Sequence, residues 1–284
     1  MTVHETNYTR NRRRLISIAT FAVLAALIAL PQLALAADEE EPVTTYTRIQ
    51  LWQVERARWG DFVEMFKKYD VPILEEMMAD GAISEWGIDA EVLHHPKGYT
   101  HTTWYSSESF GALAKAGEAY TAAWEAMDKE SMKTLDAEFA SMIVKHRDYA
   151  VDTDDMRSAA GSFEGGYYHA RYVQVTRGKH REYHSYWENR VKPVYEALFE
   201  QGVVVAYGLS TETLTTEHPM GHTSWYVVKD ADGLDAVDAA FDASWDEIDG
   251  EGRRARWASI RDVIEEDTFR ETMTSIIKMS MTAK

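Results

Sequence analysis

The second half of this 284-residue chain repeats its first half at a fixed offset of 121 residues, and this duplication constrains the fold more than any other feature. The register holds without a gap. The identical pairs include Gln53/Gln174, Val54/Val175, Arg56/Arg177, Pro72/Pro193, Gly81/Gly202, Gly87/Gly208, His101/His222, Trp104/Trp225, Tyr105/Tyr226 and Trp124/Trp245. Solenoid repeats have periods of roughly 20 to 50 residues, so this longer period indicates a duplicated domain of ordinary size.

Each copy is predicted to contain the same order of strands and helices. Aromatic and β-branched residues alternate in polarity over 45–54 and 167–175, which is typical of half-buried strands. An amphipathic helix follows each strand. The other predicted elements are second strands at 83–92 and 203–209, third strands at 99–106 and 222–228, helices at 109–127, 130–144, 231–248 and 252–265, and last strands at 148–154 and 269–278.

Proline and glycine mark equivalent points in the first helical segment of each copy. Pro72 and Pro193 should kink or restart these segments, because proline lacks an amide hydrogen and clashes with the preceding turn. Gly81 and Gly202 stand where C-terminal caps are expected.

The β-α-β-β-α-β order within each copy is the ferredoxin-like plan. We therefore predict an α+β protein built from two ferredoxin-like repeats, 45–157 and 167–284, with a linker at 158–166. The two sheets are expected to close on one another and form a pseudodimeric α/β barrel.

A further signature is the pattern Gly-x-x-x-x-Trp/Tyr-Gly at 81–87 and 202–208. With this pattern, the element order and the duplication, residues 45–280 resemble the dimeric α/β-barrel superfamily. That group contains antibiotic-biosynthesis-type monooxygenases, NIPSNAP-like proteins, and chlorite dismutase with its haem-binding relatives. The resemblance implies the fold, but it carries over no catalytic signature residue by residue.

Residues 1–36 are typical of a secretory signal peptide. Four arginines at 10–14 precede an apolar run at 15–30, and Ala34 and Ala36 form a small-x-small cleavage site. We expect cleavage after Ala36, an acidic leader at 37–44, and a periplasmic or secreted mature protein. The alternatives are export by the general or the twin-arginine route, and an uncleaved membrane anchor.

Composition excludes several classes of partner. With 47 acidic and 30 basic residues the formal net charge is −17, whereas sequence-independent nucleic-acid binding needs a basic face. The same charge opposes stable association with anionic membranes after signal cleavage. The absence of cysteine excludes disulfides, thiolate metal ligands and covalent c-type haem. We expect a monomeric pseudodimer or a homo-oligomer that binds a small molecule.

Strand alternation divides the side chains between the helix layer and the space inside the barrel. The side chains expected to face the helices are Ile49, Leu51, Trp86, Ile88, Ala170, Tyr172, Tyr207 and Leu209. Those expected to face inward are Tyr46, Arg48, Gln50, Trp52, Glu85, Asp89, Tyr167, His169 and Arg171. On the third strands, one shared side carries Tyr99, His101, Thr103 and Tyr105, and the equivalent side carries His222, Ser224 and Tyr226. If that side also faces inward, histidine and tyrosine join the enclosed groups.

Aromatic walls with a few convergent polar groups are typical of a ligand pocket. We predict His101 and His222 as acid–base groups, with Tyr105 and Tyr226 as hydrogen-bond donors. The predicted ligand-binding residues are Arg48, Trp52, Glu85, Asp89, His169 and Arg171. The structural alternative is that the two histidines are satisfied donors that pin the halves together.

His180 and His184 are four residues apart on a predicted helix, with Glu188 one turn further. This spacing permits metal binding, but Arg181 stands where zinc proteases have glutamate. We therefore expect a solvated helix face and predict no metal site.

Two classes of function remain. The first is an exported small-molecule site, either in a cofactor-free monooxygenase-like or isomerase-like enzyme or in a haem protein whose axial ligand is His101, His169, His222 or a tyrosine. The second is a non-catalytic envelope protein that binds a ligand or a protein partner.

Overall fold

The structure is a computed structural model that describes residues 44–93, 97–214, 221–246 and 248–284. The predicted signal peptide and almost all of the acidic leader lie outside these residues. No helix within the described ranges is long and apolar enough to cross a membrane.

The first half begins with a strand and ends with a strand. Its elements are β1 (Thr45–Val54), a 3-10 turn (Arg56–Arg58), α2 (Trp59–Met65), a π-helical turn (Phe66–Asp70), α3 (Val71–Ala79), β2 (Glu85–Glu91), β3 (His101–Ser107), α4 (Phe110–Glu125), α5 (Lys129–Met142) and β4 (Ile143–Ser158).

The second half follows the same order after a short strand. Its elements are β5 (Gly161–Phe163), β6 (Tyr167–Val175), α6 (His180–Arg190), α7 (Lys192–Glu200), β7 (Val204–Leu214), β8 (Gly221–Val228), α8 (Ala231–Asp246), α9 (Gly250–Arg261) and β9 (Ile264–Met281).

Eight strands of the described chain close into an antiparallel barrel. The order is β2-β3-β1-β4-β7-β8-β6-β9, and β9 pairs with β2 to complete the circle. The two halves meet at two seams, β4 against β7 and β9 against β2. The predicted α+β class and the two ferredoxin-like repeats in one α/β barrel are confirmed.

The last strand of each half is longer than the sequence predicted. β4 has 16 residues and β9 has 18, against the shorter ranges expected from local pattern. Each of these strands pairs along both edges, β4 with β1 and β7, and β9 with β6 and β2. Backbone hydrogen bonds to both neighbours extend the strand beyond what side-chain alternation alone indicates.

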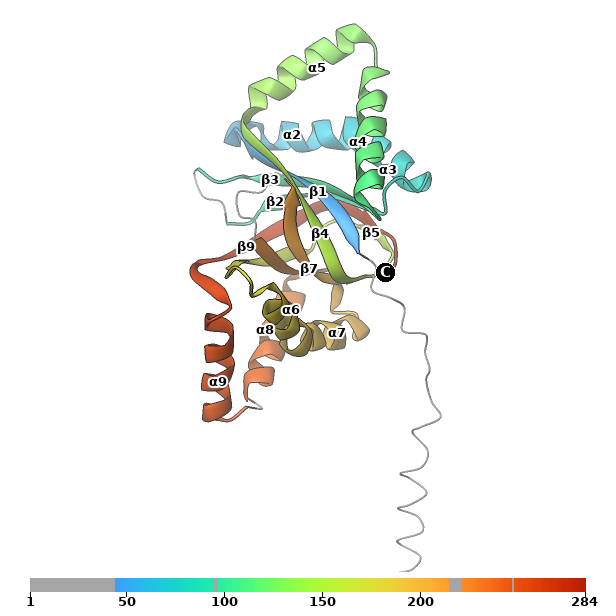
Figure 1. Ribbon diagram of the computed structural model, residues 1–284. Coiled ribbons are helices and arrows are strands. Elements are labelled where there is room, and N and C mark those ends of the chain that lie inside the picture. Colours follow the sequence, from blue (N-terminus) through green and yellow to red (C-terminus); the bar gives the residue numbers. More distant parts are fainter. Residues whose placement is uncertain (1–43, 94–96, 215–220, 247) are drawn as a thin grey trace, which may run out of the picture. The chain divides into compact units, whose positions relative to one another are not determined.

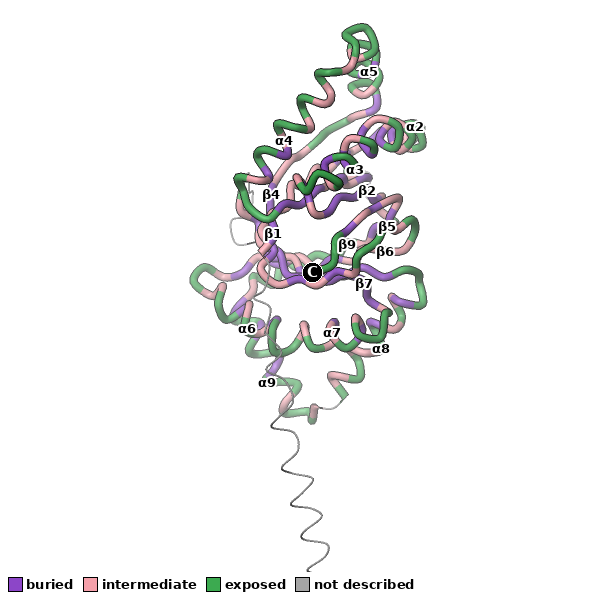
Figure 2. Tube along the Cα trace, turned by 90° about the vertical axis from the view of Figure 1, so that its right-hand side faces the viewer, coloured by how far each residue is buried: buried purple, intermediate pink, exposed green. Residues whose placement is uncertain are grey.

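Helices α2 to α5 lie on one side of the barrel and α6 to α9 on the opposite side (Figure 1). Each helix layer covers its own hydrophobic core, one around Phe62, Leu74 and Trp86, and the other around Trp187 and Tyr207. The tube in Figure 2 shows the buried residues concentrated along the strands and on the inner helix faces. Burying an apolar side chain such as Phe62 or Leu74 contributes roughly 1.5–3 kcal/mol.

The predicted proline and glycine positions are confirmed. Pro72 and Pro193 each occupy the second residue of a new helix, α3 and α7, where a missing amide hydrogen costs no helical bond. Gly81 and Gly202 follow α3 and α7 with φ angles of +73° and +72°. These are left-handed conformations that glycine adopts without steric cost.

Gly87 and Gly208 make room for two tryptophans. A Cβ atom built on Gly87 would lie 2.7 Å from the indole of Trp104, and one on Gly208 would lie 2.7 Å from the indole of Trp225. Both indoles project into the barrel from the adjacent strand. The repeated glycines therefore allow a bulky ring to lie flat against the inner wall in each half.

Candidate functional site

The barrel encloses a cavity of about 760 Å³. Its aromatic lining consists of Tyr99, Trp104, Tyr149, Tyr168, Tyr172 and Trp225. Its charged lining includes Glu85, Asp89, Glu91, Glu212, Arg147 and Arg270. A volume of this size, with aromatic walls and a few polar groups, is typical of sites for small organic molecules.

The cavity exists because many inward-facing side chains are small. On β1 and β6 the inner face carries Thr45, Thr47 and Ala170, and Thr223 follows on β8. Eight-stranded barrels have interiors just wide enough for side chains to fill. Small residues in these positions leave the space open.

One end of the cavity is exposed and the other is closed. Arg270 and Thr272 at the first end are exposed, while Thr45, Met156 and Met281 at the opposite end are buried. At the first end Arg147 forms an ion pair with Glu212 at 3.3 Å. Among the described residues, the end with the arginines is therefore the more exposed one.

Asp89 is a deeply buried carboxylate of the cavity. Its side chain comes from β2, is 5% exposed, and has an Oδ1 atom with no hydrogen-bond partner among the residues that the structure describes. Burial raises its pKa to about 7, and the nearby Thr274 side chain counteracts part of that rise. A carboxyl group with this pKa exchanges protons near neutral pH.

Two further carboxylates of β2 face the same cavity. Glu85 lies 3.4 Å from the Lys284 ammonium, and burial raises its pKa. Glu91 lies nearer the open end, and burial raises its pKa to about 7. The row Glu85, Asp89, Glu91 therefore gives the inner wall a weakly acidic stripe.

Three tyrosines of the cavity, Tyr149, Tyr168 and Tyr172, stay protonated at neutral pH. Burial raises the pKa of Tyr172 to about 12, and it raises the pKa values of Tyr149 and Tyr168 further. Neutral phenols are hydrogen-bond donors as well as aromatic surfaces.

The predictions for the second strands are confirmed. Trp86 and Ile88 pack in the core under the first helix layer, and Tyr207 and Leu209 pack under the second. Glu85 and Asp89 border the cavity as expected.

The predictions for the first strands were wrong for most residues. Ile49, Leu51, Ala170 and Tyr172 line the cavity instead of facing the helices. The residues expected inward that lie on the helix side are Tyr46, Arg48, Gln50, Trp52, Tyr167 and Arg171. Alternation identifies which residues share a face, but both faces of a barrel strand are buried, so it does not identify the inner one.

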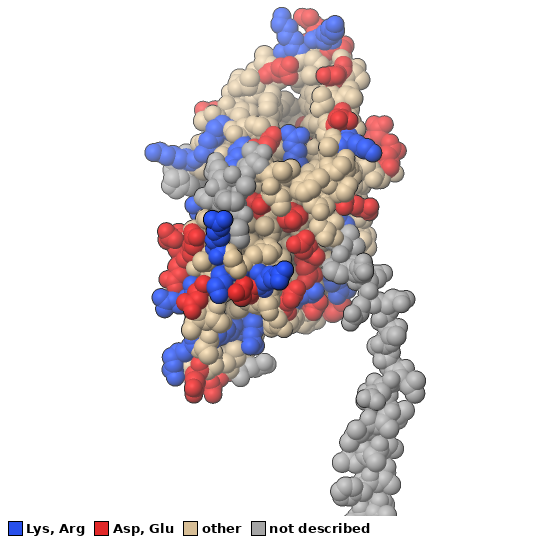
Figure 3. Space-filling view, viewed as in Figure 1, with Lys and Arg blue, Asp and Glu red and all other residues tan. Residues whose placement is uncertain are grey.

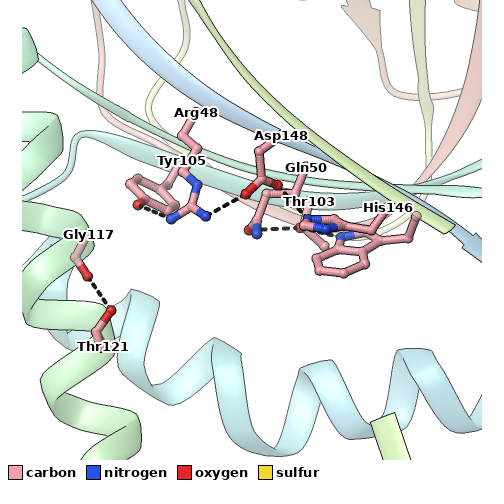
Figure 4. A network of polar contacts seen from close by, with 9 residues as sticks. Arg48, Gln50, Thr103, Tyr105, Gly117, Thr121, His146 and Asp148 are labelled. Atoms are coloured by element: carbon pink, nitrogen blue, oxygen red, sulfur yellow. Dashed lines mark hydrogen bonds and ion pairs between the residues drawn. The ribbon is translucent and has the colours of Figure 1, made fainter. Parts of the chain in front are cut away.

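Arg48 lies on the helix side of the barrel wall and not in the cavity. Its guanidinium donates to Asp148 at 2.8 Å and to the Tyr105 hydroxyl at 3.4 Å, and Asp148 also contacts His146 at 2.6 Å (Figure 4). The network joins β1, β3 and β4 on the face turned towards the helices. The charge of Arg48 is therefore matched by Asp148, away from the cavity. Arg171, in the other half, pairs with Glu271 at 2.6 Å.

The third strands also turn their histidines outward. His101 packs against Phe62, and Tyr105 lies in the same core. His222 and Tyr226 lie in or against the core of the second half. The inward-facing set is Thr102, Trp104, Ser106, Thr223, Trp225 and Val227. The sequence left open which way the histidine side faces; it faces the helices, where the space between sheet and helices accommodates these rings.

The predicted acid–base histidines thus lie outside the cavity. Burial lowers the pKa of His101 to about 4, so the ring is neutral at physiological pH, and its Nδ1 is 2.9 Å from the Thr100 hydroxyl. His169 borders the cavity, and its ring stacks on Tyr226 with centroids 5.0 Å apart. Burial also lowers the pKa of His169.

The residues of the cavity do not fit haem well. An axial ligand must aim at a space that holds the macrocycle, yet His101 and His222 lie on the other side of the sheet and the His169 ring is stacked. A tyrosinate ligand is disfavoured, because burial raises the pKa values of Tyr149, Tyr168 and Tyr172.

Charged residues are intermixed on the outer surface. Figure 3 shows acidic and basic side chains side by side over the face that it presents. Surface ion pairs such as Arg157–Glu200, at 2.8 Å, are part of this mixture.

Two solved structures share this architecture. A protein named as a putative monooxygenase from Fusobacterium nucleatum subsp. nucleatum ATCC 25586 aligns with a TM-score of 0.56 and 10% identity, over 85% of this chain and 95% of that one. Another, from Lactobacillus acidophilus NCFM, aligns with a TM-score of 0.55 and 8% identity, over 84% and 97%. The chain therefore has the fold of these two structures, the pseudodimeric α/β barrel that the sequence predicted. No family model and no curated protein matches the sequence.

Sequence reasoning missed several residues of the barrel cavity. Trp104, Trp225, Tyr149 and Tyr168 form much of the aromatic wall. The glycines at 87 and 208 were a usable signal, because a glycine within a strand often marks a close approach of another group. In this barrel, the indole rings that approach the two glycines project inward.

Proposed function

We propose that the barrel cavity binds a small aromatic molecule and removes a proton from it. The observation that carries this proposal is the buried Asp89, whose Oδ1 has no partner in the described chain and whose pKa burial raises to about 7. When the pKa of a general base lies near the working pH, much of the base is deprotonated, and it still binds a proton strongly enough to drive the transfer.

The chemistry of the lining selects the ligand class. Flat indoles at Trp104 and Trp225 favour stacking with a ring system. Carboxylates at Glu85, Asp89 and Glu91 disfavour anionic ligands. A neutral, aromatic weak acid with its acidic C–H or O–H directed at Asp89 satisfies both conditions.

Dioxygen would turn this proton transfer into a cofactor-free, monooxygenase-like oxidation. Asp89 takes a proton from an activated CH₂ group, and the resulting carbanion reduces dioxygen. One oxygen atom becomes the carbonyl of the product and the other leaves as water, so R₂CH₂ and O₂ yield R₂C=O and H₂O. The fold of the two monooxygenase-named structures is compatible with this proposal.

The base is tested with 5-nitrobenzisoxazole. Removal of its C3 proton sends the C–H electrons into a nitrile, breaks the N–O bond and releases a coloured phenolate. We expect turnover above the buffer rate that rises with pH through about 7. Asp89→Asn should abolish it, whereas Asp148→Asn, on the helix side of the barrel, should leave it unchanged.

A binding measurement made beside the turnover assay separates an enzyme from a binding protein. A neutral fluorophore, N-phenyl-1-naphthylamine, reports occupancy of the cavity independently of turnover. Binding without Asp89-dependent turnover would support a non-catalytic carrier and overturn the base. Failure of the fluorophore to bind would overturn the cavity itself as a ligand site.

We also propose that the mature protein begins at Ala37 and acts in the periplasm or outside the cell. The basic segment, apolar run and small-x-small site of residues 1–36 support this location. Mass spectrometry of protein from the periplasmic and cytosolic fractions gives the test. A full-length N-terminus in the cytosol would contradict it.

A further inference from the structure

Three histidines meet on the outer side of the barrel, between α6 and β8. His180 Nδ1 lies 2.7 Å from His222 Nε2. Ligand atoms of His180, His184 and His222 all lie within 4.8 Å of one another. His222 is 0% exposed, and the other two are half-buried. The expected solvated face for His180 and His184 was wrong, because α6 packs this side against β8.

The backbone explains how the three rings converge. His180 is the first residue of α6, and His184 is one turn later on the same face. His222 comes from the second residue of β8 and points to the helix side, opposite to its cavity-lining neighbour Thr223. The cluster is therefore separated from the cavity by the thickness of the sheet.

Two buried polar atoms beside this cluster lack a partner. His184 Nε2 and Asp152 Oδ1 have no hydrogen-bond partner in the part of the chain that the structure describes. Asp152 and His222 both pair with Thr211, one from each side, so they lie in one row across β4, β7 and β8. A buried polar atom without a partner costs about 1–3 kcal/mol, which a bound ion would offset.

The charges around the histidines favour a cation. Asp152 interacts electrostatically with His180, and Asp154, Asp155 and Glu188 act on His184. Lys192 pairs with Asp155 at 2.7 Å, and Lys179 pairs with Glu182 at 3.3 Å, while Arg181 is exposed. Asp152, Asp154 and Glu188 give the immediate surroundings an excess of negative charge.

The equivalent place in the first half shows that the fold does not require these histidines. The counterpart of His222 is His101, but Trp59 and Val63 stand where the second half has His180 and His184. His101 meets the Trp59 ring edge-on, with centroids 5.6 Å apart. In the first half, an apolar helix face is therefore enough to pack this layer.

We propose that His180, His184 and His222 form a binding site for a first-row divalent transition metal, with Zn²⁺ and Cu²⁺ as the preferred ions. Three imidazoles with a further open position are a recurrent donor set for such ions. Metal–nitrogen bonds of 2.0–2.1 Å in a tetrahedron place the nitrogens about 3.3 Å apart. His180 and His222 would separate slightly to reach this spacing, while His184 moves inward.

The fourth position is open to water. His180 and His184 are half-buried, which leaves a solvent path to the ion. Bound in this place, the metal would fix α6 to β8 and so stabilise the second half of the barrel. Its binding would raise the unfolding temperature in proportion to the logarithm of the free ion concentration.

The test uses the mature protein stripped with EDTA and then exposed to Zn²⁺ or Cu²⁺. Native mass spectrometry should show one bound ion per chain, and thermal unfolding should shift upward. His180→Asn and His184→Asn should each weaken binding by more than the 10–100-fold that loss of an outer partner typically costs. His146→Asn, which alters a histidine on β4 outside the cluster, is the matched control and should bind normally.

Some outcomes of these experiments would contradict the metal site. No stoichiometric ion at micromolar metal, or equal affinity in His180→Asn, His184→Asn and the unsubstituted protein, would overturn the proposal. Should a variant fail to fold, Co²⁺ added to the unsubstituted protein decides the matter. Intense visible absorption from tetrahedral, nitrogen-ligated Co²⁺ supports the site, and the weak spectrum of hydrated Co²⁺ overturns it.

Discussion

The ammonium of Lys284, the last residue, lies 3.4 Å from the carboxylate of Glu85 on β2, and both side chains are at most 7% exposed. Lys284 also donates to the Ser84 hydroxyl at 3.0 Å, and its backbone pairs with Ser158. Lys284 thus lies against the buried end of the cavity.

Removing this ammonium should destabilise the barrel. Lys284→Met leaves Glu85 buried without its partner charge, and we expect the free energy of unfolding at pH 8 to fall by about 3–5 kcal/mol. Urea unfolding measures the loss. The double variant Lys284→Met/Glu85→Gln should recover most of it. Equal losses in the single and double variants would show that the ion pair is not responsible.

Stability should depend on pH through buried Asp89. Burial raises its pKa from 3.8 to about 7 in the folded protein, so the folded state holds a proton that the unfolded state releases. This contribution is present below about pH 4 and is lost as pH rises to 7. Asp89→Asn cannot ionise, so its melting temperature relative to the unsubstituted protein should increase from pH 5 to pH 8.

Other buried groups also shape the overall profile, among them Asp70 and His101. Burial raises the pKa of Asp70 to about 7, which acts in the same direction, and Asp70→Asn should behave like Asp89→Asn. Burial lowers the pKa of His101 to about 4, so its contribution to stability is lost as pH falls below about 6.5. The comparison between variant and unsubstituted protein separates these opposing effects. A difference in melting temperature that is flat with pH would contradict the assignment.

Enlarging Gly208 should disturb the cavity wall. Its new Cβ would lie 2.7 Å from Trp225 and 3.1 Å from the Met156 Cβ, so Gly208→Ala should cost about 1–3 kcal/mol. The tryptophan fluorescence spectrum should shift as Trp225 moves. Gly60→Ala is the control, because nothing lies within 4 Å of its Cβ and α2 favours alanine. Equal unfolding midpoints for the two variants would contradict this steric account.

Filling the cavity should block ligands without unfolding the protein. Ile49 lines the cavity from β1, and Ile49→Trp adds an indole to the enclosed space. We expect at least tenfold weaker binding of N-phenyl-1-naphthylamine by fluorescence titration. Ile49→Leu preserves the volume and should bind as before. Unchanged binding by Ile49→Trp would place the fluorophore elsewhere.

Much of the fold could be predicted from the sequence. The 121-residue offset, the alternating segments and the capping glycines identified both repeats, and β1 and β6 begin and end at the predicted residues. Local pattern was informative here because strand alternation, proline placement and left-handed glycines act over only a few residues.

The site was less predictable. Glu85 and Asp89 were identified as inward-facing, because their neighbours Trp86 and Ile88 are strongly apolar. On β1 the competing faces both carry apolar residues, such as Trp52 and Leu51, so polarity gave no answer.

The sequence by itself therefore determined the duplication, the order of elements and the division of each strand into two faces. Only the tertiary structure decided which face encloses the cavity and which contacts the helices, because closure of the barrel buries both. It also decided that His222, from β8, meets His180 and His184, from α6. Residues about 40 positions apart come together through strand pairing and helix packing, which no local pattern specifies.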